Sequence, residues 1–229
     1  MNSSCDGCIW LPRWIANSAG KVRLKEVHGY DDLYREAIRL LNSEDLKAFD
    51  LNQESDAAKE RYGSSRVGRG CLLARRLIEN DVQYVEVQSG GWDMHNDIGD
   101  AMTGRGGELD QALSALIEDL TSSGLIHDTT IVVATEFGRK PSINQNAGRD
   151  HHPAVFSCVL AGAGVKHGTV LGSSDAKGFS VDEYPVTVQD FLATIGKAIQ
   201  VPIDEEIYSS DGRPFTFGNG GTPIDEVLA

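Results

Sequence analysis

This chain has few cysteines and no long apolar run, and each of these features excludes some classes of protein. The sequence has four cysteines, of which Cys5 and Cys8 form the single CxxC. No second CxxC and no nearby histidine pair completes a tetrahedral zinc site there, so we expect both cysteines to be dispensable. No apolar run reaches the roughly 20 residues that cross a bilayer. The start, MNSSCDGCIWLPRW, lacks the basic first residues and the continuous apolar core of a signal peptide, and we leave the compartment open.

Basic residues are also fewer than acidic residues. Lys and Arg number 21 against 34 Asp and Glu, which gives a formal net charge of −13. Such a field repels nucleic acid, and it disfavours anionic substrates unless a bound cation reverses it locally. We therefore predict no nucleic-acid partner, and the lack of a long apolar run predicts no membrane partner. The hydrophobic content of 40% is ordinary for a globular protein, so the chain can form a sizeable core.

The order of apolar segments predicts an α/β fold. Residues 82–87 (VQYVEV) and 130–134 (TIVVA) are short, β-branched runs typical of buried strands, and residues 108–120 between them have helical periodicity. This order indicates a βαβ unit with parallel strands. We predict a mostly parallel sheet flanked by helices, in a single domain over residues 31–229 that follows an irregular segment at residues 1–30.

Several other elements are marked by caps and by apolar spacing. Asp31 is the expected cap of a helix through residue 41, and Thr187 is the expected cap of a helix ending near residue 199. Gly124 is expected to end the helix over residues 108–120. We also predict helices at residues 43–50, 57–62 and 69–80, a glycine-rich loop at residues 99–107 and a buried strand within residues 154–165.

Residue types that bind metals cluster just beyond the two predicted strands. They are Asp93 and His95 after the first strand, Glu136 after the second, and Asp150, His151 and His152 on a later loop. Parallel sheets bind ligands at the carboxyl ends of their strands, so we expect these side chains at one edge. Mixed Asp, Glu and His ligands suit zinc, with manganese or iron as alternatives, rather than calcium. Binding requires neutral imidazoles, so affinity should fall as the pH drops through the histidine range.

Simpler explanations exist for parts of this pattern. GWD alone can be a packed turn, and a histidine pair alone is more often part of a surface loop. Arg139 and Arg149 flank the carboxylates, where they could hold an anionic oxygen bidentately or could pair with Glu136 and Asp150. The expected convergence on one sheet edge favours a metal site over a packed turn or a surface loop, whereas both roles of the two arginines stay open.

Three motifs together resemble one protein family. They are GWDMH at residues 91–95, TEFGR at 135–139 and GRDHH at 148–152. Over about residues 33–212 the chain is similar to the bacterial domain-of-unknown-function 1501 family, whose members resemble sulfatases and the alkaline phosphatase superfamily. The resemblance implies an alkaline-phosphatase-like α/β fold. It also implies that Asp93 and His95 correspond to an Asp and a His that bind one metal, and that His151 or His152 corresponds to a later His ligand.

The chain departs from that superfamily at two points. Glu136, Phe137 and Gly138 stand where Asp-His-Gly is usual, which keeps a carboxylate and loses an imidazole. The first metal-binding Asp and the Ser, Thr or Cys nucleophile of the superfamily's N-terminal half have no counterpart here. We therefore expect the chain to correspond to the C-terminal half of a longer member, or to a shortened one.

The resemblance implies a metal-dependent hydrolase of phosphate or sulfate esters. Its substrate would be a small anionic ester or a sulfated or phosphorylated saccharide. Because the nucleophile is missing, we expect turnover that is weak and dependent on His95, or no turnover. The alternative is a non-catalytic domain that a metal stabilises for binding or scaffolding.

Overall fold

The computed structural model describes residues 25–41 and 43–229, and Cys5 and Cys8 lie outside them. The chain divides into two compact units, Met1–Gln53 and Glu54–Ala229. None of the helices described is both long and apolar enough to cross a membrane.

Helix α2, Lys25–Leu41, dominates the described part of the first unit. It begins at Lys25 rather than at the expected cap, Asp31, so residues 25–30 are helical instead of irregular. Two 3-10 helices follow it, Glu44–Phe49 and Leu51–Gln53. The first replaces the helix predicted at residues 43–50.

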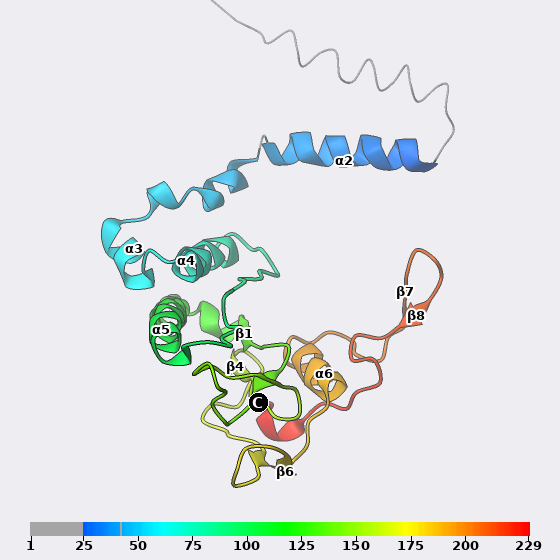
Figure 1. The fold of residues 1–229 in the computed structure, drawn as a ribbon. Helices are drawn as coiled ribbons and strands as arrows, with labels where there is room; N and C mark the ends of the chain where they lie inside the picture. Colours follow the sequence, from blue (N-terminus) through cyan, green and yellow to red (C-terminus); the bar gives the residue numbers. More distant parts are fainter. Residues whose placement is uncertain (1–24, 42) are drawn as a thin grey trace, which may run out of the picture. The chain divides into compact units, whose positions relative to one another are not determined.

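Three helices form the core of the second unit. They are α3 (Asp56–Tyr62), α4 (Arg66–Ile78) and α5 (Ile98–Ser123), which contact one another (Figure 1). Ser55 caps α3 and Ser65 caps α4 by accepting hydrogen bonds from backbone N–H groups three residues on. Tyr62, Leu72 and Leu120 are fully buried where the helices meet. The helices predicted at residues 57–62, 69–80 and 108–120 are confirmed.

Helix α5 is longer than its sequence indicated. It includes residues 99–107, so the predicted glycine-rich loop is wrong. Glycine costs a helix about 1 kcal/mol relative to alanine but does not interrupt its hydrogen bonds as proline does, so glycines weaken a helix without ending it. The C-terminal end is as predicted, because Gly124 adopts the left-handed conformation with φ +83° and ends the helix.

The predicted parallel sheet is wrong. Every strand in residues 25–41 and 43–229 belongs to a two-stranded antiparallel sheet. The pairs are β1 (Thr130–Val133) with β4 (Val159–Gly162), β2 (Gly138–Arg139) with β3 (His151–His152), β5 (Ser173–Ser174) with β6 (Val181–Glu183), and β7 (Ile207–Tyr208) with β8 (Pro214–Phe215). This is not a mostly parallel α/β sheet flanked by helices, and it is not alkaline-phosphatase-like.

The βαβ prediction failed at its first strand. Residues 82–87 form no strand, and Val82 and Tyr84 remain 37% and 77% exposed. The predicted second strand exists as β1, but it pairs antiparallel with β4, the strand expected within residues 154–165, so that Thr130 faces Gly162. Apolar spacing identifies segments that can be strands, whereas it does not identify their partners.

Helix α6, Val188–Ala198, anchors the C-terminal segment. Thr187 is its cap, as predicted, and forms a capping box in which its hydroxyl accepts from Asp190 N while Asp190 accepts from Thr187 N. Buried Thr194 accepts a hydrogen bond from Ile224 N at 3.0 Å. The final 3-10 helix, Asp225–Val227, follows this contact.

Candidate metal centre

The hairpin of β2 and β3 places two adjacent histidines in different surroundings. Arg139 pairs with His151 and Gly138 with His152, and consecutive side chains of a strand point to opposite faces. The Nε2 atom of His152 lies 2.9 Å from the carbonyl oxygen of Phe179. The His152 ring lies edge-on to the Phe179 ring, and the two ring centres are 5.6 Å apart. His151 therefore faces the other way, towards the loop that carries Asp93 and His95.

Backbone contacts hold that loop against the loop before β3. Arg149 N donates a hydrogen bond to Met94 O at 3.0 Å, which joins the two loops main chain to main chain. Gly148 lies against the backbone of His95, since a Cβ atom added to Gly148 would come 2.0 Å from the carbonyl carbon of His95. Only glycine fits there, so the loop carrying Asp150 and His151 is fixed to the backbone of His95.

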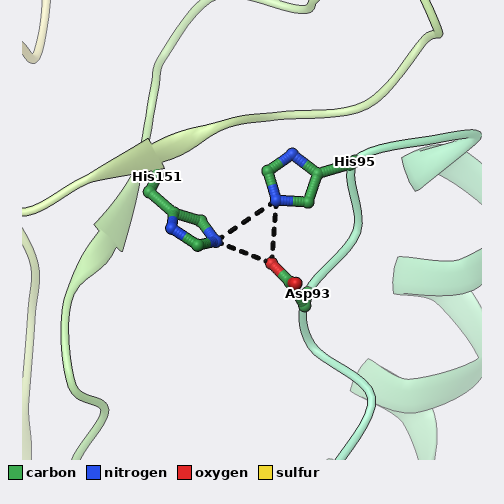
Figure 2. A group of neighbouring side chains, drawn as sticks. All are labelled: Asp93, His95 and His151. Atoms are coloured by element: carbon green, nitrogen blue, oxygen red, sulfur yellow. Dashed lines mark hydrogen bonds and ion pairs between the residues drawn. The ribbon is translucent and has the colours of Figure 1, made fainter.

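Three side-chain atoms converge between these loops (Figure 2). His95 Nε2 lies 3.0 Å from Asp93 Oδ1, His151 Nε2 lies 2.8 Å from the same oxygen, and the two nitrogens are 3.2 Å apart. The side chains are 64% (Asp93), 38% (His95) and 48% (His151) exposed, so the group is open to solvent. It is therefore accessible to a metal ion and to a small ligand.

Asp150 lies behind His95 rather than among the three converging atoms. Its Oδ1 is 3.1 Å from His95 Nδ1 and accepts a hydrogen bond from Asn144 Nδ2 at 3.0 Å. The hydrogen bonds from Asn144 and then from His95 hold the pKa of the Asp150 carboxyl below its ordinary value. A carboxylate accepts hydrogen bonds, so Asp150 could take the Nδ1 proton of His95 when the Nε2 lone pair of this ring binds a metal ion.

Asp93 is also held in its ionised form. Its hydrogen bond with His151 and then that from Arg139, whose Nη1 is 2.6 Å from Oδ1, lower the pKa of Asp93 from 3.8 to about 2. The Arg139 guanidinium also lies 5.6 Å from the centre of the Phe137 ring, and that ring lies 4.5 Å from the His151 ring. Arg139 and Phe137 thus lie against Asp93 and His151 on the side of the β2–β3 hairpin.

The donor set fits a divalent transition metal. Ligand atoms about 2.0–2.1 Å from a tetrahedral zinc ion are roughly 3.3 Å apart, close to the separations of these three atoms. A metal ion would take one lone pair from each imidazole nitrogen and one from the carboxylate oxygen, in place of the hydrogen bonds among them. Asp93, His95 and His151 thus form a possible metal-binding triad. Three protein ligands and an exposed side are typical of catalytic rather than structural zinc.

The remaining predicted site residues do not supply ligand atoms to the triad. The exposed side chain of Glu136 does not join it, and neither does His152 on the opposite face of β3. Of the predicted anion-binding residues, Arg139 pairs with Asp93 rather than with Glu136 or Asp150. Arg149 has a buried Nε that forms no hydrogen bond within the described part of the chain.

Sequence reasoning missed Asn144. This residue contacts His95, Asp150 and the backbone of its own loop. The sequence feature that could have indicated it is the segment INQNAGRD between β2 and β3. An asparagine followed shortly by a glycine often forms a turn in which the asparagine side chain hydrogen-bonds to the backbone a few residues on. Nothing in that signal indicates a contact with His95.

The comparisons with known proteins identify a family. The family model described as "Protein of unknown function (DUF1501)" matches residues 10–228. The family predicted from the three motifs is thereby confirmed. No curated protein and no solved structure matches the sequence.

Proposed function

The chain belongs to the DUF1501 family, and we propose that it binds one divalent transition metal and hydrolyses phosphate or sulfate esters with it. The ligands are Asp93, His95 and His151, and zinc is the preferred ion, with manganese or iron as alternatives. The observation that carries the proposal is the convergence of Asp93 Oδ1 and the two Nε2 atoms within 2.8–3.2 Å of one another.

Each residue around the centre has a defined task in this proposal. Asp93 supplies a carboxylate with a lowered pKa, and His95 supplies the Nε2 lone pair while its Nδ1 faces Asp150 at 3.1 Å. Arg139, next to Asp93, offers a guanidinium to an anionic ester oxygen. When bound, the ion supplies Lewis acidity that polarises the ester and activates water.

The substrate class rests on the resemblance of GWDMH, TEFGR and GRDHH to sulfatase-like hydrolases of the alkaline phosphatase superfamily. A small anionic ester, or a sulfated or phosphorylated saccharide, fits an exposed centre that combines a cation with a nearby arginine. The net charge of −13 would repel such an anion from most of the protein surface. A bound divalent ion next to Arg139 reverses the sign of the field at the centre.

A second candidate function is a metal-stabilised binding or scaffold domain. Asp93 and His151 are 58 residues apart in the chain, so an ion that binds both would link the loop that carries Asp93 to the segment that carries His151. Within residues 25–41 and 43–229, no hydroxyl or thiol group is hydrogen-bonded to any of the three ligands. A purely stabilising ion would need no such nucleophile.

Zinc binding tests the part that both functions share. We expect wild-type protein to bind one zinc ion per chain in elemental analysis and in a titration against a chromogenic chelator. His95→Ala should lose this binding, and His152→Ala should keep it, because His152 faces Phe179 rather than the triad. Wild-type protein that binds no zinc, manganese or iron would rule out both functions.

Ester hydrolysis then separates the two functions. Zinc-loaded wild-type protein is assayed with aryl phosphate and aryl sulfate, with His95→Ala and His152→Ala in parallel. Weak turnover that His152→Ala keeps and His95→Ala abolishes supports the hydrolase. Zinc binding with no turnover supports the scaffold. Robust turnover that a single Ser or Thr substitution abolishes, with zinc retained, would instead show a protein nucleophile.

A further inference from the structure

The chain enters the loop that carries Asp93 and His95 through a segment with few hydrogen bonds. Within the described part of the chain, the carbonyl oxygen of Gly90 is the one main-chain group of residues 83–91 that forms a hydrogen bond. Val87 packs against α4, since a Cβ atom added to Gly70 would come 2.7 Å from Val87 Cγ1. The main chain just before the ligand loop therefore depends on one hydrogen-bond donor.

That donor is Arg105, near the start of α5. Its Nη1 donates to Gly90 O at 3.0 Å. Its guanidinium also lies directly against Gly91, where an added Cβ atom would overlap it. Residues 99–107 are helical, and side chains of a helix point towards its N-terminus, which here is the end that follows the ligand loop. The helix thus directs Arg105 back onto the loop that precedes it.

The hydrogen bond between Arg105 and Gly90 joins two points 15 residues apart, and Asp93 and His95 lie between them. The far end of the ligand loop is held differently, because Asp97 N donates to Asn146 O at 3.1 Å and Ile98 N donates to Ala147 O at 2.9 Å. Removing the Arg105 side chain would release the part of the loop before Asp93. The main-chain bonds after His95 would remain.

We propose that Arg105 is a positioning residue, which holds Gly90 and Gly91 so that the Asp93 carboxylate reaches the two histidines. Arg105 supplies no ligand atom to the triad, so it acts through the main chain. The proposal deepens the metal-site function and rests on it for its consequence, the metal affinity. The order that Arg105 imposes on the loop does not require an ion and can be measured without one.

Zinc affinity separates positioning from a simple effect of charge. A guanidinium that acted only as a positive charge would repel the ion, so its removal would make zinc bind more tightly. Positioning predicts the opposite sign. In Arg105→Ala we expect chelator competition at fixed ionic strength to show an affinity lower by roughly three- to tenfold, because fewer molecules hold Asp93 in place. Arg105→Lys keeps a donor and should recover part of the loss.

Arg213→Ala is the control for this measurement, because it removes an exposed arginine that pairs with Asp211. It should leave zinc affinity unchanged. Alanine is the strongest helix former, so Arg105→Ala does not weaken α5 by propensity. A zinc affinity in Arg105→Ala equal to or above that of the wild type would overturn the proposal.

A double-mutant cycle with Gly91→Ala tests the contact itself. The new Cβ atom would meet the guanidinium in the wild-type background but not in Arg105→Ala, so Gly91→Ala should reduce zinc affinity less in the second background. The φ of Gly91 is +86°, and the strain that alanine suffers there is common to both backgrounds and cancels. Equal losses in the two backgrounds would also overturn the proposal.

The backbone order of residues 90–93 in metal-free protein distinguishes failure of this proposal from failure of the metal function. Nitrogen relaxation should give order parameters of about 0.85 in the wild type and below about 0.6 in Arg105→Ala. If the wild type binds no metal but shows this difference, the metal function is wrong and the positioning role stands. If zinc binds and Arg105→Ala matches the wild type in affinity and order, the metal function stands and the positioning role is wrong.

Discussion

Arg139 and Asp93 show how single residues set the properties of the triad. The Arg139 guanidinium lies 2.6 Å from the oxygen that we assign to the metal, so a positive charge already neutralises this ligand. After the hydrogen bond with His151, it is the second cause that holds the pKa of Asp93 below its ordinary value, and it also repels an incoming cation. The second effect should dominate affinity, because aspartate is ionised at neutral pH even without help.

Arg139→Gln should therefore raise zinc affinity, by about fivefold for one charge removed at a solvent-exposed site. The same variant should reduce any ester turnover, because an anion-binding group is lost. Arg213→Gln removes an exposed arginine that pairs with Asp211 and is the control. The measurement is chelator competition at fixed ionic strength. A weaker affinity in Arg139→Gln would mean that orienting Asp93 is the larger effect.

The sequence indicated which residues gather at this site, but it did not indicate how they are arranged. Metal-binding residue types in three short motifs pointed to the loops on which Asp93, His95 and His151 meet. The sequence could not separate His151 from His152, since that choice depends on which face of β3 is turned to the neighbouring loop. It also could not show that Asp150 lies behind His95, because a contact with Asn144 places it there.

Among the elements, helices were predicted more accurately than strands. Helix ends are encoded locally, by Thr187 before α6 and by Gly124 after α5. Strands depend on a partner, and residues 82–87 have strand-like spacing but no partner within the described chain. The parallel sheet was inferred from the order of segments, and pairing of β1 with β4 overrode that order.

The capping box of α6 should contribute measurably to stability. In Thr187→Ala the hydroxyl that accepts from Asp190 N is lost, so we expect the free energy of unfolding to fall by about 1 kcal/mol. Thr222→Ala is the control, because Thr222 contacts Asp190 through its backbone N–H at 2.8 Å. Urea unfolding followed by circular dichroism measures both. Equal stability of Thr187→Ala and the wild type would contradict a role for the cap.

Glu54 joins the segment before α3 to the last turn of α4. It accepts hydrogen bonds from Arg75 Nη2 at 2.5 Å and from Arg76, and its side chain is 13% exposed. Burial raises the pKa of Glu54, but the hydrogen bonds from Arg76 and Arg75 outweigh it, so the net pKa lies below the ordinary 4.5. A lowered folded-state pKa means that the stabilisation is complete above 4.5 and is lost as pH falls through the folded value.

Glu54→Gln should accordingly destabilise the protein in a pH-dependent way. At about pH 7 we expect a loss of roughly 1.5–3 kcal/mol, the range for hydrogen bonds between charged groups. At about pH 3 the difference from the wild type should shrink, because the wild-type carboxylate is then becoming protonated. Glu118→Gln, which breaks an exposed pair with Arg61, should cost at most about 1 kcal/mol. A pH-independent difference for Glu54→Gln would show that charge is not what this residue contributes.

For the molecule as a whole, the centre lies between loops and a short hairpin instead of at the edge of a large sheet. Strands β2 and β3 have two residues each, and an isolated hairpin of this size is marginally stable in water. The second unit therefore relies on its helices for stability, while the geometry of the triad relies on Gly148, Asn144 and the contact between Arg149 and Met94. An ion bound by three ligands would add a link that the hairpin itself lacks.

Zinc should consequently stabilise the folded protein in proportion to its affinity. A ligand at 100 times its Kd that binds only the folded state adds about 2.7 kcal/mol to the free energy of unfolding. We expect this increase in urea unfolding of the wild type and of His152→Ala, and none in His95→Ala. Hydrogen exchange should slow at residues 93–98 and 144–152, because the ion would hold these two loops together. Stabilisation that persists in His95→Ala, or slower exchange confined to other segments, would place the bound zinc elsewhere in the chain.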